Sequence, residues 1–335
     1  SLSFAEEKWF EFDKKSFSNG SISYPKLVNL ENKFILDKVN KKILEELKID
    51  DISSKLENKA HMSLNSEAKI HTVDGKPRIL SIKAELSEEN NPTGTALRCI
   101  NFDLLTGERL EKKDIFSDVK TAAEKIEEKL DSYIEDKVFL EKDSLLPIEL
   151  ENIFISDKSI EIFYKKAKNL SGKPFSFHLF DYEINGLLSA NILSLDSRKE
   201  VEDKKSALDA CLKNGKFDFL PVKLSDNTEK LYNEYSKLHD SEAFIDGSRI
   251  FLEDARFRDI ELVERKNSNE ISGILLKRAE FVGIKIDLSS KTDVLKAFGN
   301  TESIPFEESL NEYYGLDVDE VLVYNGHGKS ISFYF

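Results

Sequence analysis

The sequence predicts an α+β protein of two domains, with mainly antiparallel sheets and helices packed on one face. The chain has 335 residues, of which 40% are hydrophobic and 10% aromatic, so it is long enough and apolar enough for two buried cores. Segments of alternating hydrophobicity joined by short turns occur in both halves, which indicates hairpins. Amphipathic helical segments lie between them. We expect the first domain to cover residues 1–190, a linker or connecting helix 191–213, and a second small α+β domain 214–335.

In the first domain, strands and helices follow from the period of the apolar residues. The apolar residues of 30–47 recur at helical spacing, so this segment predicts an amphipathic helix. Residues 61–86 alternate instead, and Asp74 and Gly75 form the turn of the predicted hairpin. The other expected elements are strands in 9–22, 97–104, 152–155, 160–164 and 175–180, and a helical region that opens at Asp114.

The boundary between the domains is placed at 195–205, where charged residues predominate and large apolar residues are few. Beyond it, 228–238 and 291–298 are expected to be helices, and Gly299 ends the second of them. Residues 249–264 and 270–281 predict two long strands, 284–288 a short one, and 320–324 with 330–335 a terminal hairpin that turns at 326–328.

The charge of the chain disfavours a nucleic-acid partner. Lys and Arg total 49 against 63 acidic residues, so the formal net charge is −14 and a nonspecific grip on phosphates is not expected. An acidic surface attracts basic partners. No segment approaches the roughly 18 consecutive apolar residues needed to span a membrane, and the start at Ser1 suggests that an export signal has been removed.

The most informative stretch is 101–116, where a strand, a tight turn and the start of a helix follow one another. Phe102 and Asp103 end the strand, Thr106 and Gly107 form the turn, and the helical region opens at 114–116 (Asp114, Ile115, Phe116). A carboxylate beside such a turn usually accepts backbone hydrogen bonds. We therefore interpret Asp103, Thr106, Gly107, Asp114 and Phe116 as a structural motif.

Across about residues 20–190, this order of elements resembles the extracytoplasmic domain family shared by the anti-sigma factor RsiV and the peptidoglycan deacetylase PdaC. Tyr24, Pro25 and Asn40 resemble the entry segment of the family, the stretch around Phe102 its middle, and 152–164 with 175–180 its closing strands. The family commonly has a Gly-rich, His-containing loop before the middle strand. This chain has 91–96 (Asn-Pro-Thr-Gly-Thr-Ala) there, without a histidine. More weakly, about 280–335 resembles small exported lipoprotein domains of outer-membrane assembly.

The resemblance implies an exported, periplasmic or cell-surface protein that binds at the cell wall, because RsiV-like members bind lysozyme and PdaC-like members carry the domain beside a separate deacetylase. The leading hypothesis is therefore a noncatalytic bacterial envelope protein whose ligand is a protein, such as lysozyme, or peptidoglycan. If the protein is exported, a disulfide between Cys99 and Cys211 would tie the first domain to the linker. The alternative is two buried thiols.

Two other classes of function stay open. Paired carboxylates beside aromatic residues occur at Glu6, Glu7 and Asp13, and at Glu253 and Asp254, as in a carbohydrate-active hydrolase. The other class is a structural module for envelope assembly. The deacetylase metal pattern is absent from the sequence and the five histidines are scattered, so we expect neither a metal site nor a cofactor. The acidic turn at Asp317, Asp319 and Glu320 lacks the ordered spacing of a calcium loop. His178 is expected on the surface of its strand.

Overall fold

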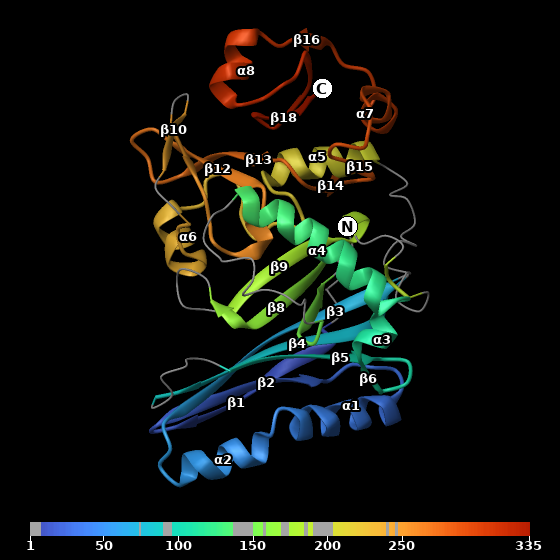
Figure 1. Cartoon of the computed structure of the whole chain (residues 1–335), viewed down its shortest axis with the longest axis vertical. Coiled ribbons are helices and arrows are strands. Elements are labelled where there is room, and N and C mark those ends of the chain that lie inside the picture. Colours follow the sequence, from blue (N-terminus) through green and yellow to red (C-terminus); the bar gives the residue numbers. More distant parts are fainter. Residues whose placement is uncertain are drawn as a thin grey trace. The chain divides into compact units, whose positions relative to one another are not determined.

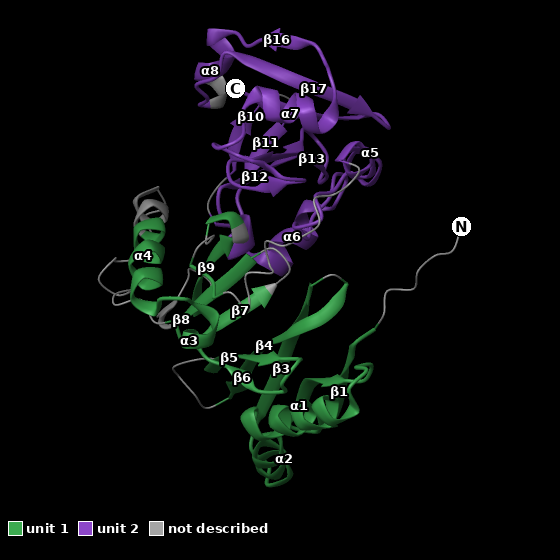
Figure 2. Ribbon diagram, turned by 90° about the vertical axis from the view of Figure 1, so that its right-hand side faces the viewer, with its two compact units in different colours: residues 1–198 green, residues 199–335 purple. Residues whose placement is uncertain are grey.

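The structure, a computed structural model, describes residues 8–73, 75–89, 96–136, 150–156, 159–168, 174–183, 187–189, 204–238, 241–244 and 247–335. The chain divides into two compact units, residues 1–198 and 199–335 (Figure 2). The division falls inside the segment that was expected to link the domains. Both units combine helices with mostly antiparallel sheets, which confirms the predicted α+β class. In the described part of the chain, every helix is too short or too polar to span a bilayer.

The first unit is built on a six-stranded sheet whose strands follow chain order (Figure 1). Its neighbours are antiparallel except β2 and β3, which are parallel. Two helices, α1 (Lys33–Glu46) and α2 (Ile49–Glu57), form the crossover that a parallel pair requires. The strands are β1 (Phe10–Phe17), β2 (Gly20–Leu27), β3 (Met62–Val73), β4 (Lys76–Glu88), β5 (Ala96–Asp103) and β6 (Arg109–Leu110).

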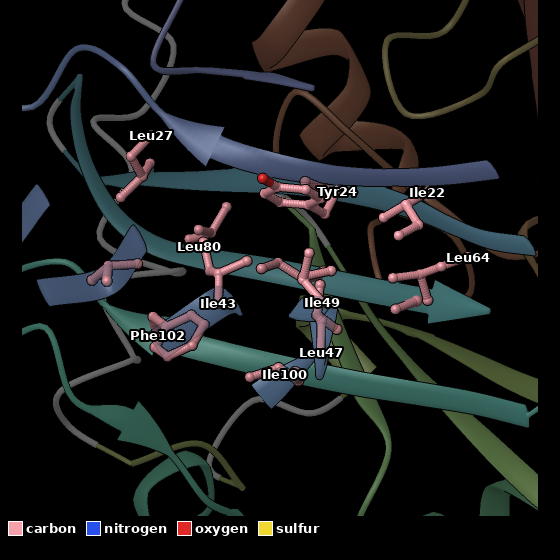
Figure 3. Close-up of a cluster of buried hydrophobic side chains, with 14 of the residues drawn as sticks. Ile22, Tyr24, Leu27, Ile43, Leu47, Ile49, Leu64, Leu80, Ile100 and Phe102 are labelled. Atoms are coloured by element: carbon pink, nitrogen blue, oxygen red, sulfur yellow. The ribbon is translucent and has the colours of Figure 1, made fainter. Parts of the chain in front are cut away.

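Helices α1 and α2 cover one face of this sheet. Ile35, Val39 and Ile43 repeat every four residues, so they form one buried stripe along α1. Figure 3 shows Ile43, Leu47 and Ile49 meeting side chains of the sheet, among them Leu80 and Phe102. Asn40 fixes the helix to β2, because its amide accepts from the Leu27 N–H at 2.8 Å and donates to the Leu27 carbonyl at 2.9 Å.

A second sheet packs on the opposite face, with the order β7 (Ile153–Ser156), β8 (Ser159–Lys168) and β9 (Pro174–Phe180). Buried polar groups join the two sheets. The Ser81 hydroxyl donates to Asn101 Oδ1 at 2.6 Å and accepts from the Ile155 N–H at 2.8 Å. Asn101 in turn donates to the Ile153 carbonyl at 2.8 Å. These bonds position β7 against the six-stranded sheet.

The second sheet also carries the helical region after the Thr-Gly turn, which consists of α3 (Lys112–Ile115) and α4 (Val119–Asp136). Ile126 and Leu130 of α4 share a core with Ile160 and Phe177. His178 lies on β9 and is only 5% exposed, so the expectation of a surface histidine was wrong. The reason is that both faces of β9 are buried along its second half. The alternation of residues in the sequence therefore does not mark one face there as exposed to solvent.

The second unit contains three small sheets and four helices among the described residues (Figure 1). One core lies between α6 and the sheet β10–β13, and a second lies between α5, α7 and the sheet β16–β18. The strands β14 and β15 pair with each other. The elements are α5 (Lys204–Asn214), α6 (Thr228–Tyr235), β10 (Glu242–Phe244), β11 (Gly247–Ile250), β12 (Ile260–Arg265), β13 (Ile271–Leu276), β14 (Glu280–Phe281), β15 (Ile284–Lys285), α7 (Lys291–Phe298), β16 (Ser303–Pro305), α8 (Glu308–Tyr314), β17 (Glu320–Gly326) and β18 (Lys329–Tyr334).

The expectation of one long strand over 249–264 was wrong, because β11 and β12 are separated by a short 3₁₀ helix, Ala255–Phe257. Asp254 begins that turn by accepting the Arg256 N–H at 2.9 Å. Asp259 then adopts a φ of +55°, which redirects the chain into β12. A side chain that bonds its own backbone competes with extended structure at this point.

We expect Ser81→Ala to lower the free energy of unfolding of the first unit by about 1–3 kcal/mol, because the buried Ile155 N–H and Asn101 amide lose their shared partner. Ser87→Ala on the same strand is the control, since Ser87 is exposed, and its effect should stay within about 0.5 kcal/mol. Urea unfolding followed by fluorescence of Trp9, the one tryptophan of the chain, reports this unit. Equal effects of the two substitutions would contradict the role assigned to Ser81.

Candidate functional site at the Thr106–Gly107 turn

The turn after β5 is held by hydrogen bonds of Asp103. Its backbone N–H donates to the Glu108 carbonyl at 2.9 Å, and its carbonyl accepts from Gly107 at 2.7 Å. The carboxylate accepts the Leu105 N–H at 2.7 Å and forms an ion pair with Arg78. Asp103 thus accepts a backbone hydrogen bond inside the turn, and its assignment to a structural motif stays a prediction.

Gly107 is required by both its conformation and its surroundings. Its φ is +69°, a region that favours glycine, and a Cβ there would lie 2.9 Å from Lys38 Cδ. The next nearest side chain is Ile35, at 3.6 Å. The turn therefore lies against the first part of α1.

Glu108, directly after the turn, binds two lysines of α1. Lys38 and Lys42 each form an ion pair with one of its carboxylate oxygens, and Lys38 also donates to the Thr106 carbonyl at 2.9 Å. The hydrogen bonds from Lys38 and then Lys42 lower the pKa of Glu108 from 4.5 to about 2. Glu108 is therefore ionised throughout the physiological pH range.

A second group of ion pairs continues along the same face of α1, because Glu46 lies four residues after Lys42. Glu46 forms an ion pair with Arg98 of β5 and a second one with Arg109 of β6, at 3.2 Å. The polar face of α1 is thus attached to the end of the sheet at several points, while its apolar face is buried on the strands.

A pocket of about 190 Å³ opens beside the turn. This volume is below the roughly 300–1,000 Å³ of sites that enclose drug-sized ligands. Its carboxylates are mostly engaged: Asp103 with Arg78, Glu108 with the two lysines, and Asp114 with the Glu111 N–H at 2.9 Å. The lining residues are Arg78, Ile79, Asp103, Thr106, Glu108, Arg109, Leu110 and Asp114.

The predicted motif residues come together around this pocket with one exception. Asp103, Thr106 and Asp114 line it, and Gly107 lies in the same turn. Asp114 also completes a capping box with Glu111 at the start of α3. The exception is Phe116, which is buried in the core between α4 and the second sheet and packs the segment against that core.

Two exposed apolar side chains, one in the turn and one at the start of α1, had no part in the sequence motif. Leu105 is 65% exposed immediately before Thr106, and Phe34 is 74% exposed in the first turn of α1, beside Ile35, which lies against Gly107. The sequence signal for Leu105 is an apolar residue inside a polar turn. The partner of Lys38 and Lys42 had no such signal, because Glu108 is far away in the sequence.

Two of the carboxylates considered for hydrolysis have defined partners in the structure: Asp13, which accepts the Tyr24 hydroxyl at 3.2 Å, and Asp254. Asp254 begins a 3₁₀ helix and forms an ion pair with Arg256 at 2.8 Å. Glu320 belongs to the acidic turn that was compared with a calcium loop, and it forms an ion pair with Lys291 at 2.6 Å. Glu6 and Glu7 lie outside the described residues. Within the described part of the chain, His, Cys, Asp and Glu side chains form no cluster suited to a metal ion.

The other residues singled out in the sequence are the Gly-His-Gly turn near the end of the chain and the two cysteines. His327 and Gly328 form the two-residue turn between β17, which ends at Gly326, and β18, and His327 Nε2 lies 2.8 Å from Asp209 Oδ1. Cys99 is buried in the first unit beside Phe154 and Phe163. Cys211 is buried on α5 in the second, where burial raises the pKa of its thiol to about 11. A disulfide between the two cysteines stays a prediction.

The comparisons with known proteins give similar solved structures but no match at the level of sequence. No protein family matches the sequence, and no curated protein matches it either. A DUF3298 family member from Bacteroides fragilis NCTC 9343 is similar over 56% of this chain and 98% of its own, with 13% identity and a TM-score of 0.39. A DUF3298 family protein from Pseudomonas aeruginosa PAO1 is similar over 55% and 94%, with 13% identity and a TM-score of 0.40.

We expect Glu108→Gln to reduce the acid sensitivity of the first unit. The carboxylate of Glu108 has a lowered pKa in the folded state, so its stabilising contribution is complete above pH 4.5 and is lost as the pH falls toward about 2. The midpoint of urea unfolding should therefore fall more steeply with decreasing pH in the wild type than in the variant, between pH 4.5 and about 2. Glu45→Gln on the exposed face of α1 is the matched control and should follow the wild type. Parallel curves for Glu108→Gln and the wild type would contradict the assignment.

Proposed function

We propose that this chain is a noncatalytic binding protein of the bacterial envelope with a protein or peptidoglycan ligand, and that the corner formed by the Thr106–Gly107 turn and the start of α1 contacts that ligand. The observation that carries the proposal is the exposure of Leu105, in the turn beside a small pocket whose charged groups are largely neutralised by one another, together with that of Phe34 in the first turn of α1. Apolar side chains with a polar rim are typical of interaction surfaces.

The electrostatics of the corner favour binding over hydrolysis. A glycoside hydrolase needs one carboxyl group that holds a proton near neutral pH, which requires a raised pKa. At this pocket the pKa of Glu108 is lowered instead, and Asp103 is engaged by Arg78 and by the Leu105 N–H. The hydrolase alternative therefore finds no support from these residues.

Lysozyme is the specific partner that we propose to test first. The net charge of −14 attracts a strongly basic protein at long range and would raise the association rate at low salt. The sequence resemblance to RsiV-like receptors supports the same partner and the extracytoplasmic location. A peptidoglycan ligand is the second candidate, because PdaC-like domains lie beside a deacetylase that acts on it.

The test is a titration of the purified chain against lysozyme and, separately, against soluble peptidoglycan fragments, at about 0.15 M salt. We expect saturable binding of one of the two ligands. Binding of the fragments alone would leave the function as proposed and exclude lysozyme. Binding of neither would overturn the proposal and favour a structural role in envelope assembly.

Leu105→Asp should weaken binding by about tenfold or more, because it places a charge in the apolar centre of the proposed contact. The control is Leu288→Asp, since Leu288 is 71% exposed and belongs to the second unit. Both side chains are exposed, so neither substitution should unfold the protein, and circular dichroism would verify this. If the two variants bind the ligand with equal affinity, this corner does not contact the ligand.

A further inference from the structure

We propose that β18 of the second unit is a self-pairing edge, where the β18 strand of a second copy of this chain docks in antiparallel orientation. The inference concerns a surface other than the turn in the first unit and does not depend on the proposed ligand.

The outward-pointing backbone groups of β18 follow from the pairing of its last residue. Phe335 exchanges two hydrogen bonds with Glu320: its N–H donates at 2.9 Å and its carbonyl accepts at 3.2 Å. In an antiparallel pair such residues alternate with residues whose N–H and C=O point to the other side. Phe333 and Ile331 therefore bond to β17, whereas Ser330, Ser332 and Tyr334 direct their backbone groups away from it.

This outward side is the edge of the sheet. The strand order is β16, β17, β18, and no other strand among the described residues hydrogen-bonds to β18. Proteins usually protect an edge with charges, proline or a bulge. The edge strand β1 of the first unit is protected in this way by four charged residues, Glu11, Asp13, Lys14 and Lys15. Apart from Lys329 at its start, β18 contains neither a charge nor a proline.

The sequence of this edge is complementary to itself. When two β18 strands run antiparallel with Ser332 opposite Ser332, Ser330 lies opposite Tyr334, so the outward N–H and C=O groups of both chains meet. Ile331 then lies opposite Phe333 on the face that carries the core with α5 and α7. Lys329 lies opposite Phe335 rather than another lysine. A two-fold axis through Ser332 thus joins apolar with apolar residues and brings no like charges together.

Ser332→Pro tests the proposed hydrogen bonds directly. Proline removes the Ser332 N–H, which the β17–β18 pair does not use, so the fold of the unit should persist. Sedimentation of the wild type should show a concentration-dependent species of twice the 38.3 kDa chain. Ser332→Pro should raise the dimer dissociation constant about tenfold or more, the effect of two lost backbone bonds. Ser332→Thr keeps the N–H and should dimerise like the wild type.

A charge exchange tests the register independently of folding. Ser332→Lys and Ser332→Glu each place two like charges opposite one another across the axis, so each variant alone should dimerise less than the wild type at low salt. An equimolar mixture should recover dimers, because lysine then faces glutamate. A wild type that stays monomeric at all concentrations, equal dimerisation of Ser332→Pro and Ser332→Thr, or a mixture that recovers no dimer would each overturn the proposal.

Discussion

The first unit depends on one constraint, which is that its central strand β4 is buried on both faces. Leu80, Ile82 and Ala84 point into the core under α1 and α2, while Ile79 and Ser81 point toward the second sheet. A sheet that is buried on both faces needs a cover on each. The crossover helices supply one cover, and β7–β9 with α4 supply the other. Since β5 lies next to β4, the turn at its end is held between α1 and the start of α3.

The same constraint explains why polar side chains lie between the two sheets. Ser81 and Asn101 satisfy backbone groups of β7, so their burial contributes to the positioning of the second sheet. Lys83 lies on the same face. Burial alone would lower its pKa, but Glu67 and Glu161 raise it above the usual value, and Lys83 remains a cation. Its ammonium group lies 2.9 Å from Glu67 and 5.3 Å from the centre of the Phe163 ring.

Prediction from the sequence failed mainly where polar residues are buried. Periodicity identified α1, the β3–β4 hairpin and α7 correctly, because in each case the burial pattern agrees with the local period. It failed for His178, since an alternating strand that is covered by another layer resembles a half-exposed one. Helix α2 was missed because it is short and begins after Lys48, whose φ of +54° no sequence pattern indicates. The Thr-Gly turn was predictable from its residues, but its attachment to α1 was not, because it depends on tertiary pairing between Lys38, Lys42 and Glu108.

The ion pairs at the turn also determine how this corner can recognise a ligand. A carboxylate that is bonded to two lysines offers little unbalanced charge at short range, and a salt bridge with a ligand would have to replace bonds that already exist. The net charge of −14 acts over longer distances and would guide a basic ligand without defining the contact. Specificity must then come from shape and from exposed apolar side chains such as Leu105. The proposed contact at the β18 edge of the second unit is similar in this respect, because it would use backbone groups and apolar side chains rather than charges. Both proposed surfaces would therefore bind through packing and hydrogen bonding rather than through unbalanced charge.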